Sequence, residues 1–199
     1  PQRREQERLQ LLAFLEMASK VGRIGAWSLE LPHLVHRWSD ATRAIHEADP
    51  DTSLGLDDLL EYYLPEDRKK VRRLLDACMT EGAPFDEELP FVTAKGTQLW
   101  VRVIGEAARD ELGRIIRIQG AIQDITERKR AESSLLASEN RFRQLAEAMP
   151  LVVWMANADG ELDYLNQVFF DVTGMSRRAL VTGTWVACLH PEDRRRCMR

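Results

Sequence analysis

A short block of sequence that occurs twice constrains the fold more than any other feature of the chain. Residues 63–73 (YLPEDRKKVRR) align with residues 189–199 (LHPEDRRRCMR), and the identical run Pro-Glu-Asp-Arg stands in one register. Two further matches have nearly the same offset and the same order: residues 38–40 (WSD) over 164–166 (YLN), and Trp27 over Trp154. Matches in this order predict two copies of one structural unit.

The stretch between the copies has the pattern of one long helix. Residues 124–149 contain no Gly or Pro, and apolar or small side chains recur at alternating steps of four and three, at Ala131, Leu135, Ser138, Phe142, Leu145 and Met149. Such a helix would be about 37 Å long, more than a compact domain needs. An amphipathic helix folded onto a core is the alternative, but the repeat favours a connector.

The copies and the connector divide the chain into four parts. We expect an N-terminal amphipathic helix (residues 1–18), a complete domain (19–124), a connector helix (125–149) and the first half of a second domain (150–199). The second copy has no counterpart of the residues beyond Arg73 in the first. We therefore expect it to be truncated and the sequence to be part of a longer polypeptide.

The first copy switches from helical to strand periodicity after Gly82. Alternating apolar and polar residues predict strands at residues 25–31, 34–38, 85–93, 98–107 and 114–123, with turns at Gly96 and Gly113. Helices are expected at residues 41–46, 56–62 and 65–81. This order predicts an α+β unit, with a five-stranded antiparallel sheet and the helices covering one face.

Composition excludes several classes of protein. The net charge is −4, from 28 basic and 32 acidic residues mixed along the chain, so nucleic acid is not an expected partner. Apolar runs such as residues 11–15 are too short to span a bilayer, and no membrane contact is expected. The three cysteines lack metal-ligand spacing and cannot all pair, which fits a cytoplasmic protein without a metal site.

Several of these motifs together resemble the PAS domain with its C-terminal PAC part. They are the strand that ends in Gln-Asp-Ile-Thr at residues 123–126, the Trp-Ser-Asp opening of the first short helix, and the Pro-Glu-Asp-Arg opening of the long one. The resemblance covers residues 19–132 and, as half of a second unit, residues 141–199. It implies the sensory, non-catalytic region of a cytoplasmic bacterial histidine kinase or diguanylate cyclase/phosphodiesterase, with an output domain later in the same chain. The alternatives are a ligand-free dimerisation scaffold and a cofactor-bound redox or light sensor.

Candidate functional residues fall into two groups, and none is catalytic. Trp27, Trp38 and Trp100 could line a pocket for an unidentified small molecule, although tryptophans in such a domain are more often core residues. The resemblance implies that Asp124 and Thr126 tie the last strand to the outgoing helix. The spacing of Asp124 and Glu127 predicts a capping box, with Asp124 as the N-cap.

No cofactor is expected. The Asn-Cys-Arg-Phe-Leu motif that attaches flavin in some relatives is absent, so Cys78 and Cys188 are interpreted as structural. Haem-binding relatives use a His on the long helix, and residues 65–81 contain none. His46 is expected to be a surface or capping residue.

A homodimer is expected because an exposed apolar stripe on a connector has nothing within its own chain to cover it. The candidate seam consists of Leu135, Phe142 and Leu145, and residues 9–18 could form a second seam.

Overall fold

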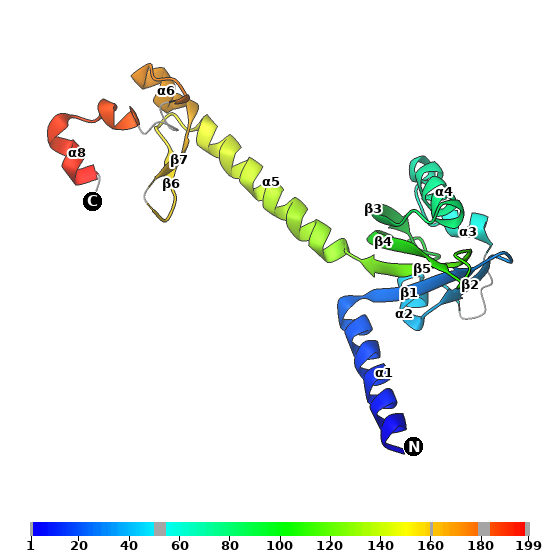
Figure 1. The fold of residues 1–199 in the computed structure, drawn as a ribbon. Helices are drawn as coiled ribbons and strands as arrows, with labels where there is room; N and C mark the ends of the chain where they lie inside the picture. Colours follow the sequence, from blue (N-terminus) through cyan, green and yellow to red (C-terminus); the bar gives the residue numbers. More distant parts are fainter. Residues whose placement is uncertain (1, 50–54, 160, 179–183, 198–199) are drawn as a thin grey trace. The chain divides into compact units, whose positions relative to one another are not determined.

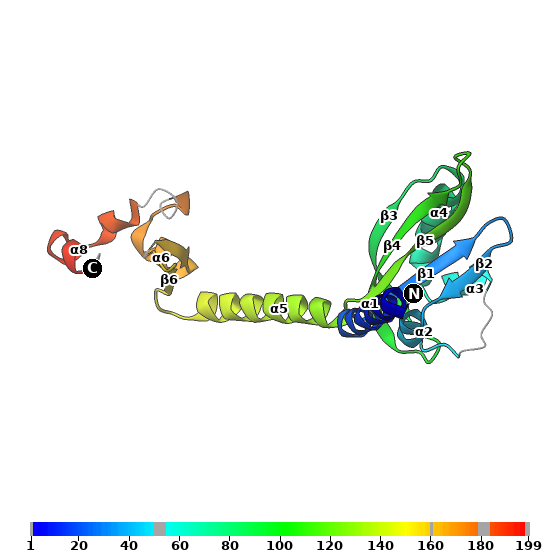
Figure 2. The same ribbon diagram turned by 60° about the horizontal axis from the view of Figure 1, so that its bottom comes forward.

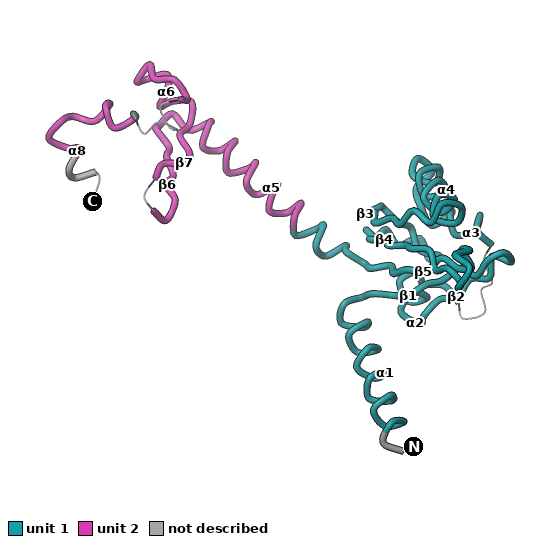
Figure 3. The backbone as a smooth tube through the Cα atoms, in the orientation of Figure 1, with its two compact units in different colours: residues 1–131 teal, residues 132–199 magenta. Residues whose placement is uncertain are grey.

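The computed structural model describes residues 2–49, 55–159, 161–178 and 184–197. They form two compact units, residues 1–131 and residues 132–199 (Figure 3). Helix α5 (Thr126–Ala148) begins in the first unit and continues into the second. None of the helices in the described part of the chain is long and apolar enough to cross a lipid bilayer.

The first unit is built on a five-stranded antiparallel sheet, and the predicted α+β fold class is confirmed (Figures 1 and 2). The strand order is β2-β1-β5-β4-β3. The strands are β1 (Ile24–Glu30), β2 (Val35–Trp38), β3 (Phe85–Val92), β4 (Gln98–Arg109) and β5 (Ile115–Asp124). Three helices, α2 (Asp40–His46), α3 (Leu56–Leu60) and α4 (Pro65–Thr80), lie between β2 and β3 in the sequence and cover one face of the sheet.

Alternation along the strands places one set of side chains under these helices. Leu29, Phe91, Val101 and Ile118 point inward and are almost fully buried. Val71, Leu75 and Cys78 of α4 complete the same core. The hairpin turns at Gly96 and Gly113 are confirmed, and both glycines have a positive φ that a side chain would disfavour.

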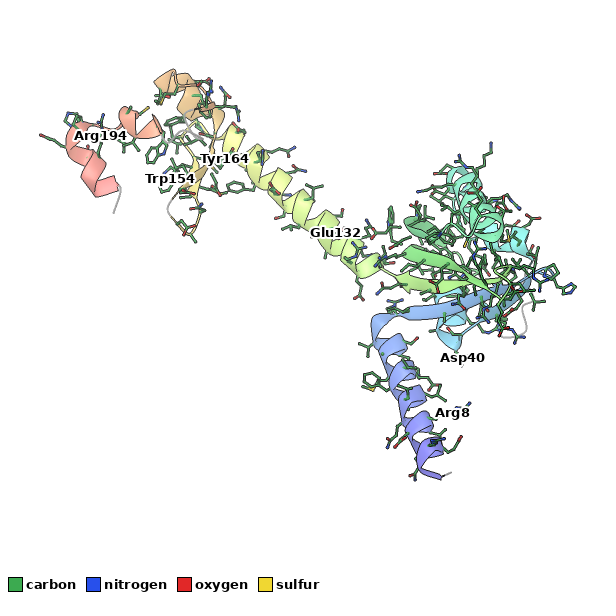
Figure 4. All side chains as sticks on the ribbon, in the orientation of Figure 1. Arg8, Asp40, Glu132, Trp154, Tyr164 and Arg194 are labelled. Carbon is green, nitrogen blue, oxygen red and sulfur yellow. The ribbon has the colours of Figure 1, made fainter. Side chains whose placement is uncertain are left out.

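Helix α1 (Gln2–Gly22) differs from the amphipathic helix expected at residues 1–18. Its apolar residues occur on all sides of the helix, and all of the large ones are exposed: Leu9, Leu11, Leu12, Phe14, Leu15, Met17 and Val21. Figure 4 shows the side chains of α1 projecting from the helix without a covering element. The predicted amphipathic face is therefore absent, because the spacing of these residues does not gather them on one side.

The second unit follows the beginning of the same plan. Strands β6 (Trp154–Ala156) and β7 (Leu162–Leu165) pair antiparallel and lead into α6 (Gln167–Thr173). A 3-10 turn, η1 (Thr184–Cys188), and α8 (Pro191–Cys197) come next. Helix α6 ends at Gly174, whose φ is 68°. Gly160, between these two strands in the sequence, lies outside the described residues.

Candidate functional site

A small cavity lies between the sheet and the helices of the first unit. Its volume is about 70 Å³, and its walls are mostly apolar. The sheet contributes Trp27, Leu29, His36, Trp38, Phe85, Glu87, Leu89, Val103 and Ile122, and the helices contribute Thr42, His46, Leu56, Leu60, Val71 and Leu75 among others. The cavity is large enough to hold water and smaller than the usual pocket for a drug-sized ligand.

The three candidate tryptophans do not share this cavity. Trp27 and Trp38 are cross-strand neighbours on β1 and β2, and both line it. Trp100 does not: its neighbours Val101 and Val103 point into the core, so alternation places Trp100 on the outer face of the sheet. There the ammonium of Lys129 lies 5.1 Å from the centroid of its ring. Trp100 thus belongs to the base of α5 and not to the pocket.

His46 is a cavity residue that the sequence did not indicate, and the expectation of a surface or capping His is wrong. The side chain is buried and its ring lies 4.1 Å from that of Trp38, centroid to centroid. Its Nδ1 lies 2.8 Å from the carbonyl oxygen of Thr42, which can only accept, so Nδ1 carries a proton. Burial lowers the pKa of His46 to about 4. The ring is therefore neutral near pH 7, and its Nε2 is able to accept a hydrogen bond.

Two further nitrogens mark a polar side of the cavity. Trp27 Nε1 and His36 Nε2 are buried, and neither has a hydrogen-bond partner among the described residues. Burial also lowers the pKa of His36, which favours its neutral form. Buried polar groups beside a cavity of this size are ordinarily satisfied by water or by a ligand. This arrangement can bind a small uncharged molecule, and the small-molecule ligand stays a prediction.

The predicted joint between β5 and α5 is a set of buried hydrogen bonds. Oδ1 of Asp124 accepts a hydrogen bond from the backbone N–H of Thr126 at 2.9 Å, and its Oδ2 lies 2.5 Å from the guanidinium of Arg23. The hydroxyl oxygen of Thr126 accepts from the backbone N–H of Trp100 at 2.9 Å. The N–H of Ile125 donates to the carbonyl of Trp100, also at 2.9 Å. The start of α5 is thereby fixed to both β5 and β4.

The predicted capping box is not formed. Helix α5 begins at Thr126, so Asp124 lies one position before the N-cap. The backbone N–H of Asp124, which the box would pair with Glu127, donates instead to the carbonyl oxygen of Arg23 at 3.1 Å. Glu127 is exposed in the first turn of the helix, where its charge favours the positive end of the helix dipole.

Glu88 of β3 is a further residue of the joint that the sequence did not reveal. One carboxylate oxygen lies 2.5 Å from the guanidinium of Arg128, and the other lies 2.7 Å from the ammonium of Lys129. Hydrogen bonds from Lys129 and Arg128 lower the pKa of Glu88. The acidic run of residues 86–88 and the basic run of residues 128–130 were the available signal, but only the fold brings them together.

Two protein families match the chain, and they cover both copies. A family described as the PAS fold matches residues 35–122, and one described as the PAS domain matches residues 140–199. The chain belongs to the PAS family. The resemblance drawn from the repeated motifs is thereby confirmed for both units.

Curated PAS relatives are much longer than this chain. An uncharacterized protein of Sinorhizobium fredii is 31% identical over 130 residues, which is 65% of this chain and 16% of that protein. A probable diguanylate cyclase of Escherichia coli is 22% identical over 94% of this chain and 17% of its own length. A blue-light-activated histidine kinase of Brucella ovis is 29% identical over 72% of this chain and 29% of its own length. The chain thus spans less than a third of each of these relatives.

A solved structure agrees with the PAS assignment. A sensory box histidine kinase/response regulator from Burkholderia thailandensis matches with a TM-score of 0.51 and 27% identity. The match covers 65% of this chain and 98% of that one.

The second PAS unit holds the C-terminal end of α5 through Asn166. This side chain is fully buried, and its Nδ2 donates to the carbonyl oxygens of Ala146 and Leu151, both at 2.8 Å. Its Oδ1 accepts from the backbone N–H of Val153 at 3.0 Å. Glu147, also in α5, accepts from the Tyr164 hydroxyl at 3.1 Å and from the backbone N–H of Gln167 at 2.7 Å.

Ser39 has the matching position in the first PAS unit, because Ser39 and Asn166 are the N-caps of α2 and α6; the alignment of residues 38–40 with 164–166 is therefore shifted by one residue. Its hydroxyl oxygen accepts from the backbone N–H of Ala26 at 3.0 Å, as Asn166 does from Val153, and its own N–H donates to the Ala26 carbonyl at 2.9 Å. Asn166 makes the same backbone bond to Val153 at 3.0 Å. The repeat therefore extends to equivalent hydrogen bonds made by different side chains.

The three candidate seam residues on α5 are all exposed. The exposed fractions are 72% for Leu135, 42% for Phe142 and 58% for Leu145. Phe142 also packs edge-on against Tyr164, with centroids 6.0 Å apart, so it contributes to the second unit as well. The dimer seam stays a prediction.

Proposed function

We propose that this chain is the sensory and relay region of a cytoplasmic bacterial signalling protein. Its PAS units would act upstream of a histidine kinase or a cyclic-di-GMP output domain in the same polypeptide. The relatives named as a probable diguanylate cyclase and as a histidine kinase support both output classes. Helix α5 carries the state of one PAS unit to the next.

The observation that carries this proposal is that α5 is fixed at each end by hydrogen bonds, with a buried one at either end. At its start, Asp124 and Thr126 tie the helix to the sheet of the first unit. At its end, the Ala146 carbonyl and the Glu147 carboxylate are bonded to the second unit. A helix held in this way transmits rotation because its backbone is stiff, whereas a loosely attached linker would not.

Alanine insertions in α5 of the full-length protein test the relay. One to four alanines placed after Ser138, which is exposed, would rotate the downstream segment by about 100° each. We expect signal-dependent output to be lost with one or two inserted residues and to recover with four, close to a full turn. The same insertions at the exposed Gly113 turn serve as the control and should have no periodic effect. Signal-dependent output that is unchanged by the insertions in α5 would contradict the relay.

Self-association is a second function that a specific observation favours. Seven large apolar residues of α1 and the seam residues of α5 are exposed, and a single soluble chain rarely leaves so many large apolar side chains in water. We propose that a second copy of the chain covers them. A dimer formed through both helices is compatible with the relay, because parallel signalling helices would move together.

Sensing through a bound cofactor is the alternative that we do not favour. One relative is named for blue-light activation, but this chain lacks the Asn-Cys-Arg-Phe-Leu motif for flavin attachment. Cys78 is buried in the core on α4, and burial raises the pKa of its thiol. A thiol that stays protonated and has little access is a poor nucleophile. We therefore propose that this PAS unit operates without a covalently bound cofactor.

A further inference from the structure

Strand β3 carries two neighbouring carboxylates on opposite faces of the sheet. Glu87 lines the cavity, and its Oε2 lies 2.7 Å from Nζ of Lys70 on α4. Glu88 points to the outer face and binds Arg128 and Lys129 in the first turns of α5. Adjacent side chains of a strand project to opposite faces from one rigid backbone, so a shift of β3 that moves one carboxylate moves the other.

We propose that β3 transmits the state of the cavity to α5, and that Glu88 is the positioning residue that sets the direction of the helix. This inference rests on the proposed relay function and assigns its route through the first PAS unit. The route runs from α4 and the cavity through Lys70 and Glu87, along β3, and out through Glu88.

The place of β3 in the sheet suits this role. It is an edge strand: in the described part of the sheet its neighbour is β4, with one further bridge from Phe91 to Tyr63, so most of its length is less constrained than β1, β4 or β5. Phe85, Glu87 and Leu89 present three successive inward side chains to the cavity. A change in the contents of the cavity, or a movement of α4, therefore bears directly on an edge strand, which has more freedom to shift than the strands inside the sheet.

Glu88 contacts α5 at some distance from the point where the helix is attached to the sheet, which we call the pivot of α5. The bonds of Asp124 and Thr126 hold one point, where the chain leaves β5. Arg128 and Lys129 lie about 3 to 5 Å further along the helix axis. A contact at that distance sets the direction of the helix, which the pivot alone leaves free. The Lys129 ammonium above the Trp100 ring adds a contact on the same side.

Hydrogen exchange on the 199-residue chain tests the role of Glu88. Exposed ion pairs add little to global stability, so Glu88→Gln should leave the domain folded while loosening α5. We expect exchange of the amides at residues 129–133 to rise about fivefold, with no change in β4 or β5. Asp86→Asn is the matched control: it removes a carboxylate from the same strand and face, but one that pairs with Arg102 within the sheet at 2.5 Å.

A second variant tests the transmission step itself. Lys70→Met removes the partner of Glu87 on α4 and leaves every bond of Glu88 in place. If β3 links the two, the exchange of residues 129–133 should change in this variant too. Unchanged exchange in Glu88→Gln would overturn the positioning role, and unchanged exchange in Lys70→Met would overturn the route through β3. Neither hydrogen-exchange measurement depends on the signalling output of the full-length protein. A negative result in them would overturn the role of Glu88 or the route through β3, whereas a negative result with the alanine insertions would overturn the relay itself.

Discussion

The hydroxyl oxygen of Thr126 accepts a hydrogen bond from the backbone N–H of Trp100, so the first residue of α5 supplies a partner for the strand beside it. The carbonyl of the same Trp100 accepts from Ile125. Buried backbone groups need hydrogen-bond partners, and for Trp100 of β4 the joint provides a partner for the N–H and one for the carbonyl. The first residues of α5 thus take part in the hydrogen-bond network of the sheet.

Thr126→Val should weaken this joint without changing its shape. The variant keeps the volume of the side chain and leaves the Trp100 N–H without its acceptor, which should lower the free energy of unfolding by about 1 to 2 kcal/mol. Urea denaturation followed by circular dichroism measures the loss. Thr126→Ser, which retains the hydroxyl, is the control and should lie close to wild type. Equal stability of the Val and Ser variants would mean that the bond contributes nothing.

Asp124→Ala should lower the free energy of unfolding by a similar amount. It removes the acceptor for the Thr126 N–H and the buried partner of Arg23. Asp124→Asn keeps an oxygen for Thr126 and should recover part of the loss in the same urea experiment. In the full-length protein, we expect Asp124→Ala to lose its response to signal. Intact regulation despite reduced stability would favour the scaffold alternative.

His46 should make the stability of the first unit depend on pH. The pKa of the folded state, about 4, lies below the ordinary value of 6.5, so between these values the unfolded chain binds a proton that the folded chain does not. Stability from this group is therefore complete above about pH 6.5 and declines as the pH falls towards 4. Between pH 7.5 and 5.0, wild type should lose about 2 kcal/mol more than His46→Phe, which keeps an aromatic ring and cannot titrate. Urea titrations at both pH values measure the difference, and equal losses would contradict it.

Leu135→Lys combined with Leu145→Lys should shift a dimer towards monomer. Both side chains are exposed, and neither has the second role that Phe142 has against Tyr164. Multi-angle light scattering over a concentration series measures the change. Gln144→Lys places a lysine on the opposite face of α5 and should have no effect. A strict monomer at high concentration in the wild type would refute the seam.

Gly120→Ala should be far more damaging than Gly113→Ala. A Cβ on Gly120 would lie 1.8 Å from the carbonyl oxygen of Ile104 and 2.9 Å from the Trp27 ring, so the sheet must distort, at a cost of about 3 kcal/mol. A Cβ on Gly113 meets nothing within 4 Å and suffers only from its φ of 78°, which costs about 1 kcal/mol. Thermal unfolding should rank the two variants in this order. Similar melting temperatures would contradict the close packing at Gly120.

Much of the fold could be read from local patterns in the sequence. Period-two alternation located the strands, and Gly96 and Gly113 located the turns, because both depend on residues that are neighbours in the chain. The repeat then predicted the second unit. The same alternation could have shown that Trp100 lies on the outer face of the sheet. Val101 and Val103 lie on the inward face of β4, and Trp100 is out of phase with them.

The interior of the candidate site depended on contacts between distant segments. His46 is buried because Trp38 and Phe91 pack against it, and no local sequence pattern indicates these contacts. The capping box was lost for a similar reason. The N–H of Asp124 was already bonded to Arg23, which lies about a hundred residues earlier in the chain. Local propensity gives way where such a tertiary partner competes for the same donor.

Strand β3 is also an edge of the sheet, where strands of separate molecules can pair. An open edge strand is a template on which another chain can add, and such growth leads to aggregation. Along β3, Pro90 has no N–H to offer, and the N–H of Val92 is already bonded to the carbonyl of Tyr62 at 2.7 Å. The strand that directs α5 is therefore protected against edge-to-edge polymerisation at Pro90 and Val92, where no free N–H remains for a second chain.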